Sequence, residues 1–329
     1  MKILKRILLF FGITVIILYA VLWIVSQKTY SVEFGISFNQ NHAESLGLDW
    51  KKVYTDMLEE LSPKYIRIAA MWSQIEAVKT EFNFDDVDFM MEKAKEHGTK
   101  VVLVVGQKAP RWPECHVPGW LDYSQEESRN HLSTYITKVV ERYKDNEALE
   151  MWQVENEPYI RFVFGECTGY DKEFVADEIA LVKKLDPQHK IMITDSGELA
   201  SWHQASKAGD VFGTTLYRIV KTPKGHIFTY DFLPPAFYRW KAFFWGVELQ
   251  DFFIAELQAE PWFSDSTPMD TPIVEQEQTM NPERLKQHLL YAQKIGSPRA
   301  YLWGVEWWYY MNQAHNDNRY WNIVKEAIQ

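Results

Sequence analysis

The chain lacks the features that identify several large classes of protein. Lysine and arginine number 35 against 45 aspartate and glutamate residues, which gives a net charge of −10 over 329 residues. No basic stripe interrupts this acidic balance, so we expect no nucleic-acid partner. The stretch Asn39–His42 follows the first predicted strand and is not a glycine-rich phosphate loop, which argues against a doubly wound nucleotide-binding sheet.

Metal-ligating residues are also sparse. The only cysteines are Cys115 and Cys167, which permit a disulfide in an oxidising compartment without requiring one. The histidines do not converge at the spacing of a metal site; they include His116, His203, His226 and His315. We therefore expect neither a metal nor a cofactor.

Aromatic residues are abundant. They make up 15% of the chain, with 14 Trp and 17 Tyr, and hydrophobic residues in total make up 47%. Such a composition fits a protein that stacks sugar rings on aromatic faces, and it fits equally a protein with a large core. The length suits one α/β barrel, which takes roughly 250 residues.

The N-terminus predicts a membrane anchor. Lys2, Lys5 and Arg6 precede an apolar run over Ile7–Val25, close to the ~20 residues that cross a bilayer. The stretch Trp23–Gln27 offers no small-x-small cleavage site, although a cleaved signal peptide is the alternative. The basic cluster should stay in the cytoplasm. We therefore expect residues 1–30 to anchor an extracytoplasmic barrel formed by residues 31–329, or to release it if they are cleaved.

Strand-like and helical runs alternate along the rest of the chain, as in a parallel α/β fold. For example, Trp50, Val53, Met57 and Leu61 share one helical face, and Pro63 follows it. The predicted strands are Val32–Phe38, Tyr65–Ala69, Lys100–Val105, Leu149–Val154, Lys190–Thr194, Val211–Tyr217, Phe252–Ala255 and Ala300–Trp303. Strand–helix units in this number, with no linker between them, predict a closed (β/α)8 TIM barrel.

Chemistry in such a barrel sits where the strands end. Glu157 follows the fourth predicted strand and Glu256 the seventh, with an arginine and aromatics at other strand ends. Two carboxyl groups that flank one bond can protonate a leaving oxygen and stabilise an oxocarbenium-like transition state. This combination predicts a glycosidase.

The segment Trp152–Pro158 ends in Asn156-Glu157-Pro158 and resembles clan A of the glycoside hydrolases, which includes families 5, 39 and 42. The resemblance implies that Glu157 is the acid/base and that Asn156 holds the substrate 2-hydroxyl. Simple alternation would send these two side chains to opposite faces, so the strand must end in a turn or bulge there.

The segment Phe253–Gln258 resembles the nucleophile segment of that clan, with its Glu-Leu-Gln most similar to family 42. The resemblance implies that Glu256 is the nucleophile of a retaining mechanism. Glu260 and Glu306 are competitors, but each falls beyond the end of its predicted strand. The sixth strand lacks the His-x-Tyr common in family 5, so the family within the clan is left open.

The same resemblance implies roles for residues at other strand ends. Arg67 is implied to bond the nucleophile, Tyr217 to contact it, and Trp303 to form the floor under the sugar. Trp72 and Trp112 are candidates for further sugar subsites. For each of these residues, packing or a structural ion pair is the alternative reading.

Cys115 follows the third strand and Cys167 the fourth, so both lie in loops on one face. A disulfide between them would brace the acid/base loop. We expect a monomer that acts on an extracytoplasmic poly- or oligosaccharide. The alternatives are a membrane-tethered transglycosylase and a non-catalytic sugar-binding barrel; sugar, linkage and exo or endo mode are not readable from the sequence.

Overall fold

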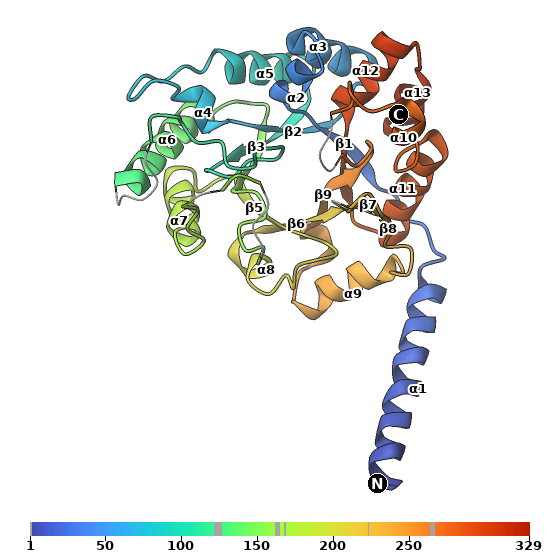
Figure 1. Cartoon of the computed structure of the whole chain (residues 1–329). Coiled ribbons are helices and arrows are strands. Elements are labelled where there is room, and N and C mark those ends of the chain that lie inside the picture. Colours follow the sequence, from blue (N-terminus) through green and yellow to red (C-terminus); the bar gives the residue numbers. More distant parts are fainter. Residues whose placement is uncertain (1, 122–126, 162–164, 168, 223, 264–266) are drawn as a thin grey trace.

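A closed barrel of parallel strands forms the centre of the computed structural model, which describes residues 2–121, 127–161, 165–167, 169–222, 224–263 and 267–329 (Figure 1). The barrel strands are β1 (Glu33–Ser37), β2 (Tyr65–Ala69), β3 (Lys100–Val105), β4 (Leu149–Val154), β5 (Lys190–Asp195), β6 (Val211–Leu216), β9 (Phe252–Gln258) and β10 (Arg299–Trp303). They pair in the order β1-β10-β9-β6-β5-β4-β3-β2, and β1 closes onto β2. The predicted barrel is confirmed. Strand β9 runs beyond the predicted end at Ala255, so Glu256 lies inside it.

Helices surround the barrel, and the longer ones, such as α3 (Trp50–Leu61) and α11 (Pro282–Ile295), each bury one apolar face (Figure 1). In α3, Asp49 caps the N-terminus by accepting from the amides of Lys51 and Lys52, and Ser62 ends the helix in the left-handed region. The helices that follow α1 (Lys2–Val25) are α2 (Gln40–Ser45), α3 (Trp50–Leu61), α4 (Trp72–Ile75), α5 (Asp85–Glu96), α6 (Glu127–Tyr143), α7 (Val175–Leu185), α8 (Ala205–Ala208), α9 (Ala236–Phe244), α10 (Ile273–Gln276), α11 (Pro282–Ile295), α12 (Val305–His315) and α13 (Arg319–Ile328).

Side-chain alternation divides each strand between two layers. In β2, Ile66 and Ile68 join the large cluster that includes the helices, whereas Tyr65 belongs to a smaller cluster with Val102 and Met151. Residues two apart share a face, so Arg67 points the same way as Tyr65, toward the barrel interior. This register places the Arg67 side chain inside the barrel, where it contacts the residues described below.

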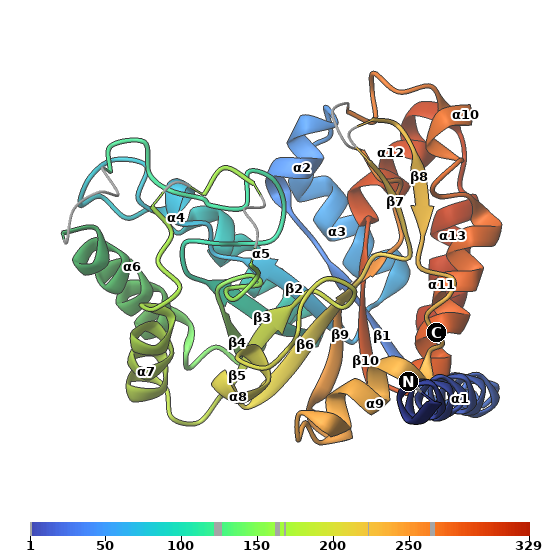
Figure 2. The ribbon, with the colours of Figure 1, turned by 60° about the horizontal axis from the view of Figure 1, so that its bottom comes forward.

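A short hairpin of β7 (Ile219–Lys221) and β8 (Ile227–Thr229) follows β6 and was not predicted from the sequence. Strand β8 lies near α10 at the rim of the barrel (Figure 2). The helix that follows this hairpin is α9 (Ala236–Phe244).

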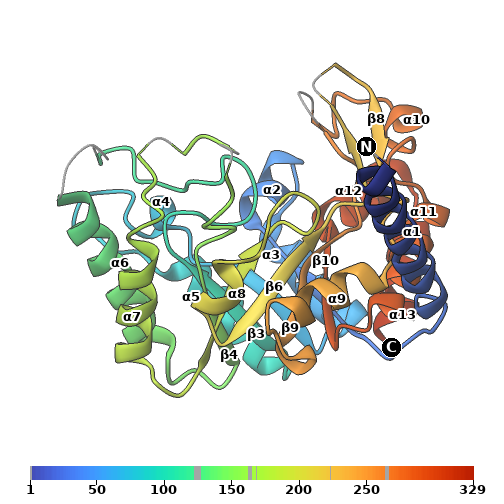
Figure 3. The same ribbon diagram turned by 90° about the horizontal axis from the view of Figure 1, so that it is seen from below.

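Helix α1 (Lys2–Val25) projects from the flank of the barrel (Figures 1 and 3). Within it, Ile3–Val25 is long and apolar enough to cross a membrane, and none of its most apolar window is buried against the protein. The Tyr19 hydroxyl of α1 donates to the Phe232 carbonyl at 2.7 Å, and the Ala236 amide donates to Oγ of Ser26, the residue after α1, at 2.8 Å.

Candidate active site

A cavity of about 770 Å³ opens at the carboxyl ends of the strands. This volume is in the range of small-ligand sites. Predicted site residues that line it are Trp112, Asn156, Glu157, Tyr217, Glu256 and Trp303. The barrel therefore brings together side chains that are far apart in the sequence.

The chain turns sharply after β4, as the sequence required. Glu155 and Glu157 both have positive φ, 59° and 45°, a region that non-glycine residues rarely adopt. The buried Glu155 carboxylate fixes this turn by accepting from the amides of Gln107 and Lys108 at 2.7 and 2.6 Å. This turn allows the side chains of Asn156 and Glu157 both to line the cavity.

Glu256 is held by two donors. Arg67 Nη1 donates to Glu256 Oε1 at 2.9 Å, and the Tyr217 hydroxyl donates to Glu256 Oε2 at 2.6 Å. The Arg67 side chain is 1% exposed and that of Glu256 is 5% exposed. Both oxygens of a buried carboxylate are thus engaged, which stabilises its negative charge and fixes its orientation.

Arg67 uses its remaining donors on β4 and the turn that follows it. Its Nε donates to Gln153 Oε1 at 2.7 Å, and its Nη2 donates to Asn156 Oδ1 at 2.9 Å. One planar guanidinium therefore orients residues from β4 and β9 against each other. A lysine ammonium has no matching fork of donors.

Glu157 has a different environment from Glu256. Thr215 Oγ1 donates to Glu157 Oε1 at 3.1 Å, and the Glu157 amide donates to Thr194 Oγ1 at 2.9 Å. Desolvation raises the pKa of Glu157 well above its usual value, and the negative charges of Glu256 and Glu114 add to the rise. A carboxyl group that keeps its proton near neutral pH can act as a general acid.

Glu114 also lines the cavity, and sequence reasoning missed it. Asn156 Nδ2 donates to Glu114 Oε2 at 3.3 Å. Burial raises the pKa of Glu114 to about 7, with a partial offset from the Lys108 ammonium. Glu114 lies in the loop after β3, where no periodic pattern marks it; its place beside Cys115 was the only available signal.

The two competing glutamates are engaged elsewhere in the mouth. Arg111 pairs with Glu260, and its Nη2 lies 3.1 Å from Glu306 Oε2. Its guanidinium also stacks 4.2 Å from the centroid of the Trp303 ring. His42, Glu260 and Glu306 each offer an atom that could bind a metal ion, and these atoms lie within 4.8 Å of one another. The positive charge at the two carboxylates is supplied by Arg111.

The two further tryptophans differ in their placement. Trp112 is exposed and lines the cavity. Trp72 does not: it is fully buried in α4, stacked on Tyr135 at 5.5 Å, and its Nε1 donates to Glu76. The prediction that Trp72 lines a sugar subsite is wrong, because the chain enters α4 directly after β2 and turns this ring into the helical layer.

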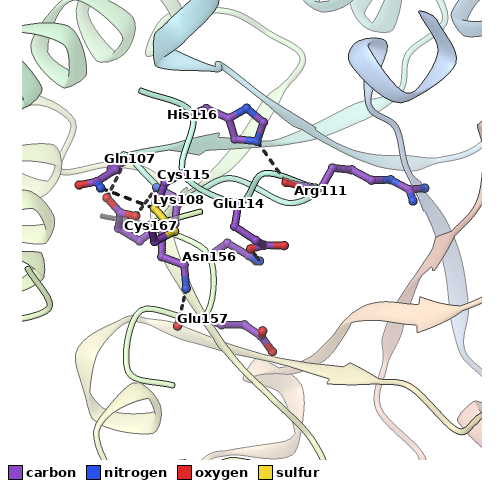
Figure 4. Close-up of a disulfide and its surroundings, with 10 residues drawn as sticks. Gln107, Lys108, Arg111, Glu114, Cys115, His116, Asn156, Glu157 and Cys167 are labelled. Carbon is purple, nitrogen blue, oxygen red and sulfur yellow. Dashed lines mark hydrogen bonds between the residues drawn. A yellow bond between two sulfur atoms is a disulfide. The ribbon is translucent and has the colours of Figure 1, made fainter. Parts of the chain in front are cut away.

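Cys115 and Cys167 form a disulfide that joins the loop after β3 to the loop after β4 (Figure 4). Beside it, Lys108 Nζ donates to the carbonyl of Glu157 at 3.3 Å. The segment that carries Glu114 is therefore tied, covalently and by hydrogen bonds, to the turn that carries Asn156 and Glu157.

Comparisons with known proteins agree with the barrel fold. The model of glycosyl hydrolase family 10 matches residues 26–211, more than half of the 329-residue chain. A 68-residue stretch is 37% identical to a probable mannan endo-1,4-beta-mannosidase F of Emericella nidulans, over 20% of this chain and 14% of that protein.

Two solved structures show the same fold at low identity. Gan42B, a family 42 beta-galactosidase from G. stearothermophilus, matches with a TM-score of 0.58 and 14% identity, over 90% of this chain and 56% of that one. Xylanase 10B from Thermotoga maritima matches with a TM-score of 0.54 and 17% identity, over 86% of this chain and 85% of that one. The barrel is thus that of the clan A enzymes, whereas the chain spans only part of the mannosidase and of the beta-galactosidase.

Proposed function

As the chain belongs to glycosyl hydrolase family 10, we propose that it cleaves O-glycosidic bonds of an extracytoplasmic poly- or oligosaccharide by double displacement. The observation that carries the proposal is the contrast between two carboxyl groups in one cavity. Glu256 is surrounded by donors that favour its charged form, and Glu157 is in surroundings that favour its protonated form. Environments that separate the protonation states of two acids assign the roles of nucleophile and acid.

In the first step a Glu256 oxygen attacks the anomeric carbon. The glycosidic C–O bond breaks, and the proton of Glu157 passes to the leaving oxygen. In the second step the Glu157 carboxylate takes a proton from water, and the water oxygen attacks the same carbon. The bond to Glu256 breaks and its carboxylate returns to the donors of Arg67 and Tyr217.

The remaining cavity residues position the sugar in this proposal. Asn156, held by Arg67 and Glu114, presents its amide to the sugar 2-hydroxyl. Trp303 and Trp112 offer aromatic faces for stacking. The names of the relatives indicate the first substrates to try, namely β-1,4-mannan, xylan and β-galactosides.

We also propose that residues 1–30 anchor the enzyme in a membrane, with the barrel of residues 31–329 outside the cytoplasm. The support is the apolar helix Ile3–Val25 and the basic residues that precede it. Protease treatment of intact cells should digest the barrel and leave a cytoplasmic marker protected. Protection of the barrel would contradict this topology.

The activity is tested on an aryl β-glycoside with Glu157→Ala and Glu256→Ala, each measured against the exposed control Glu173→Ala. We expect both cavity variants to lose at least about 10³-fold in kcat/KM and the control to keep its rate. Unchanged rates in both cavity variants would refute the enzyme assignment. Product analysis with and without added acceptor sugar separates a hydrolase from a transglycosylase, because only the latter transfers the sugar in preference to water.

A further inference from the structure

Large aromatic side chains are exposed on the flank of the barrel beside α1. They are Phe228, Phe232, Trp240, Phe243 and Phe244, which we call the aromatic patch. Phe243 is 80% exposed and Phe244 61%. Soluble surfaces rarely gather so many large apolar side chains, and a patch of this kind marks a contact with another protein or with a membrane.

The patch follows from the sequence of α9. Tyr238 and Ala242 bury the inner face of this helix against the core. Trp240, Phe243 and Phe244 are three and four residues apart, so they share the outer face. Both faces of α9 are thus apolar, and the aromatic side chains of the outer face are exposed in the part of the chain that the structure describes.

The patch lies next to the outer end of the apolar helix. Phe232 accepts the hydrogen bond from Tyr19, and Ala236, the first residue of α9, donates to Ser26. Tyr19 is six residues before the end of α1 at Val25, about 9 Å along the helix. A span of 23 residues is about 35 Å long and exceeds the ~30 Å hydrocarbon core by about one turn, so Tyr19 lies near the outer edge of that core, just below the headgroups.

Charge at this junction suits a membrane surface. Lys28 Nζ and the Arg239 guanidinium each lie 4.8 Å from the centre of the Tyr30 ring, directly after α1. Trp and Tyr prefer the membrane interface, and Lys and Arg beside them attract anionic headgroups. Helix α9, which carries Trp240, Phe243, Phe244 and Arg239, lies on the side of the barrel toward which α1 projects (Figure 1).

We propose that the aromatic patch rests on the outer leaflet of the membrane that α1 spans, so that the barrel lies on the bilayer by its flank. This inference rests on the membrane anchor proposed above. Tyr230 lines the cavity and packs 5.0 Å from Phe228, ring centre to ring centre. The rim of the cavity is therefore continuous with the patch, and the enzyme meets glycans held close to the bilayer surface.

The test places an environment-sensitive fluorophore at single cysteines in the full chain, reconstituted in phosphatidylcholine–phosphatidylglycerol vesicles. The native cysteines are joined in the disulfide, so under non-reducing conditions only the introduced thiol reacts. Phe243→Cys reports the patch, Ile13→Cys reports the anchor, and Val78→Cys is the matched control. Val78 is an exposed apolar residue outside the patch, in the loop after α4.

Lipids spin-labelled near the headgroup should quench the label at position 243 by roughly a half, because a side chain on an interfacial helix lies about 5–10 Å into the headgroup–acyl boundary. The label at position 78 should keep its intensity, and lipids spin-labelled deep in the chain should quench the label at position 13. Quenching at position 13 without quenching at position 243 overturns the proposal that the aromatic patch rests on the membrane, and it leaves the anchor intact. Equal quenching at 243 and 78 also overturns it. No quenching at 13 refutes the anchor and the inference with it.

Discussion

Replacement of Arg67 by methionine should lower the free energy of unfolding strongly, because Arg67 is the buried cation that pairs with Glu256. The guanidinium donates charge-assisted hydrogen bonds to Gln153, Glu256 and Asn156 at 2.7, 2.9 and 2.9 Å. Methionine fills similar space but leaves the Glu256 carboxylate without its buried cation. Removing one partner of a buried ion pair costs about 3–5 kcal/mol, because the other charge stays uncompensated.

The measurement is urea unfolding of the full chain in mild detergent, followed by far-UV circular dichroism. Arg67→Met should lower the free energy of unfolding by about 3–5 kcal/mol. The matched control is Arg142→Met, whose side chain is 45% exposed where it pairs with Asp88. An exposed pair of this kind contributes about 0–1 kcal/mol. A loss of less than about 1 kcal/mol for Arg67→Met would show that the ion pair does not hold the mouth together.

Arg67→Lys then separates charge from geometry. Lysine restores a cation near Glu256 but cannot bond Gln153 and Asn156 at the same time. We expect stability to recover in part, while kcat/KM stays at least about 10²-fold below wild type because Asn156 and Glu256 are misplaced. Full recovery of both quantities would mean that charge alone is required.

Four further changes test other parts of the mouth. Glu114→Gln removes a negative charge that raises the pKa of Glu157. Glu157 should then lose its proton at lower pH, and the high-pH limb of kcat/KM should move to lower pH; a limb that stays in place or moves to higher pH contradicts the coupling. Thr215→Val removes the donor to Glu157 Oε1 and should lower kcat more than it raises KM, whereas a pure KM effect would place Thr215 in substrate binding. The double variant Cys115→Ser/Cys167→Ser opens a loop with a sequence separation of 52 and should lower the free energy of unfolding by about 2–4 kcal/mol. The urea midpoint should fall accordingly; an unchanged midpoint would show that the loops are rigid without the bond. Gly106→Ala should destabilise by more than about 1 kcal/mol, because φ is +118° and the new Cβ would lie 2.5 Å from Glu155 Oε1; a neutral urea midpoint would refute this.

Prediction from the sequence succeeded where one physical signal dominated. Lys100–Val105 is a short β-branched run bounded by polar residues, and a strand buried on both faces reads in that way. All parallel strands of a closed barrel end at one mouth. Identifying the strands was therefore enough to predict that Glu157 and Glu256 lie near each other, and both line one cavity.

Loops carried no comparable signal. Arg111 and Glu114 lie in the segment after β3, whose course depends on the disulfide and on Glu155 rather than on periodicity. Trp72 shows the converse error: a tryptophan after a strand end looks the same in sequence whether it enters the cavity or the helical layer. The β7–β8 hairpin was missed because each strand has only three residues.

The carboxylate of Glu155 has a consequence for engineering. It spans from the turn after β4 to the backbone of the preceding βα segment, where it meets the amides of Gln107 and Lys108. Barrel folds support different chemistries by variation of their βα loops. An exchange of the segment after β3 alone would leave the buried Glu155 carboxylate without its two amide donors, directly beside Glu157, so these two segments must be exchanged as a pair.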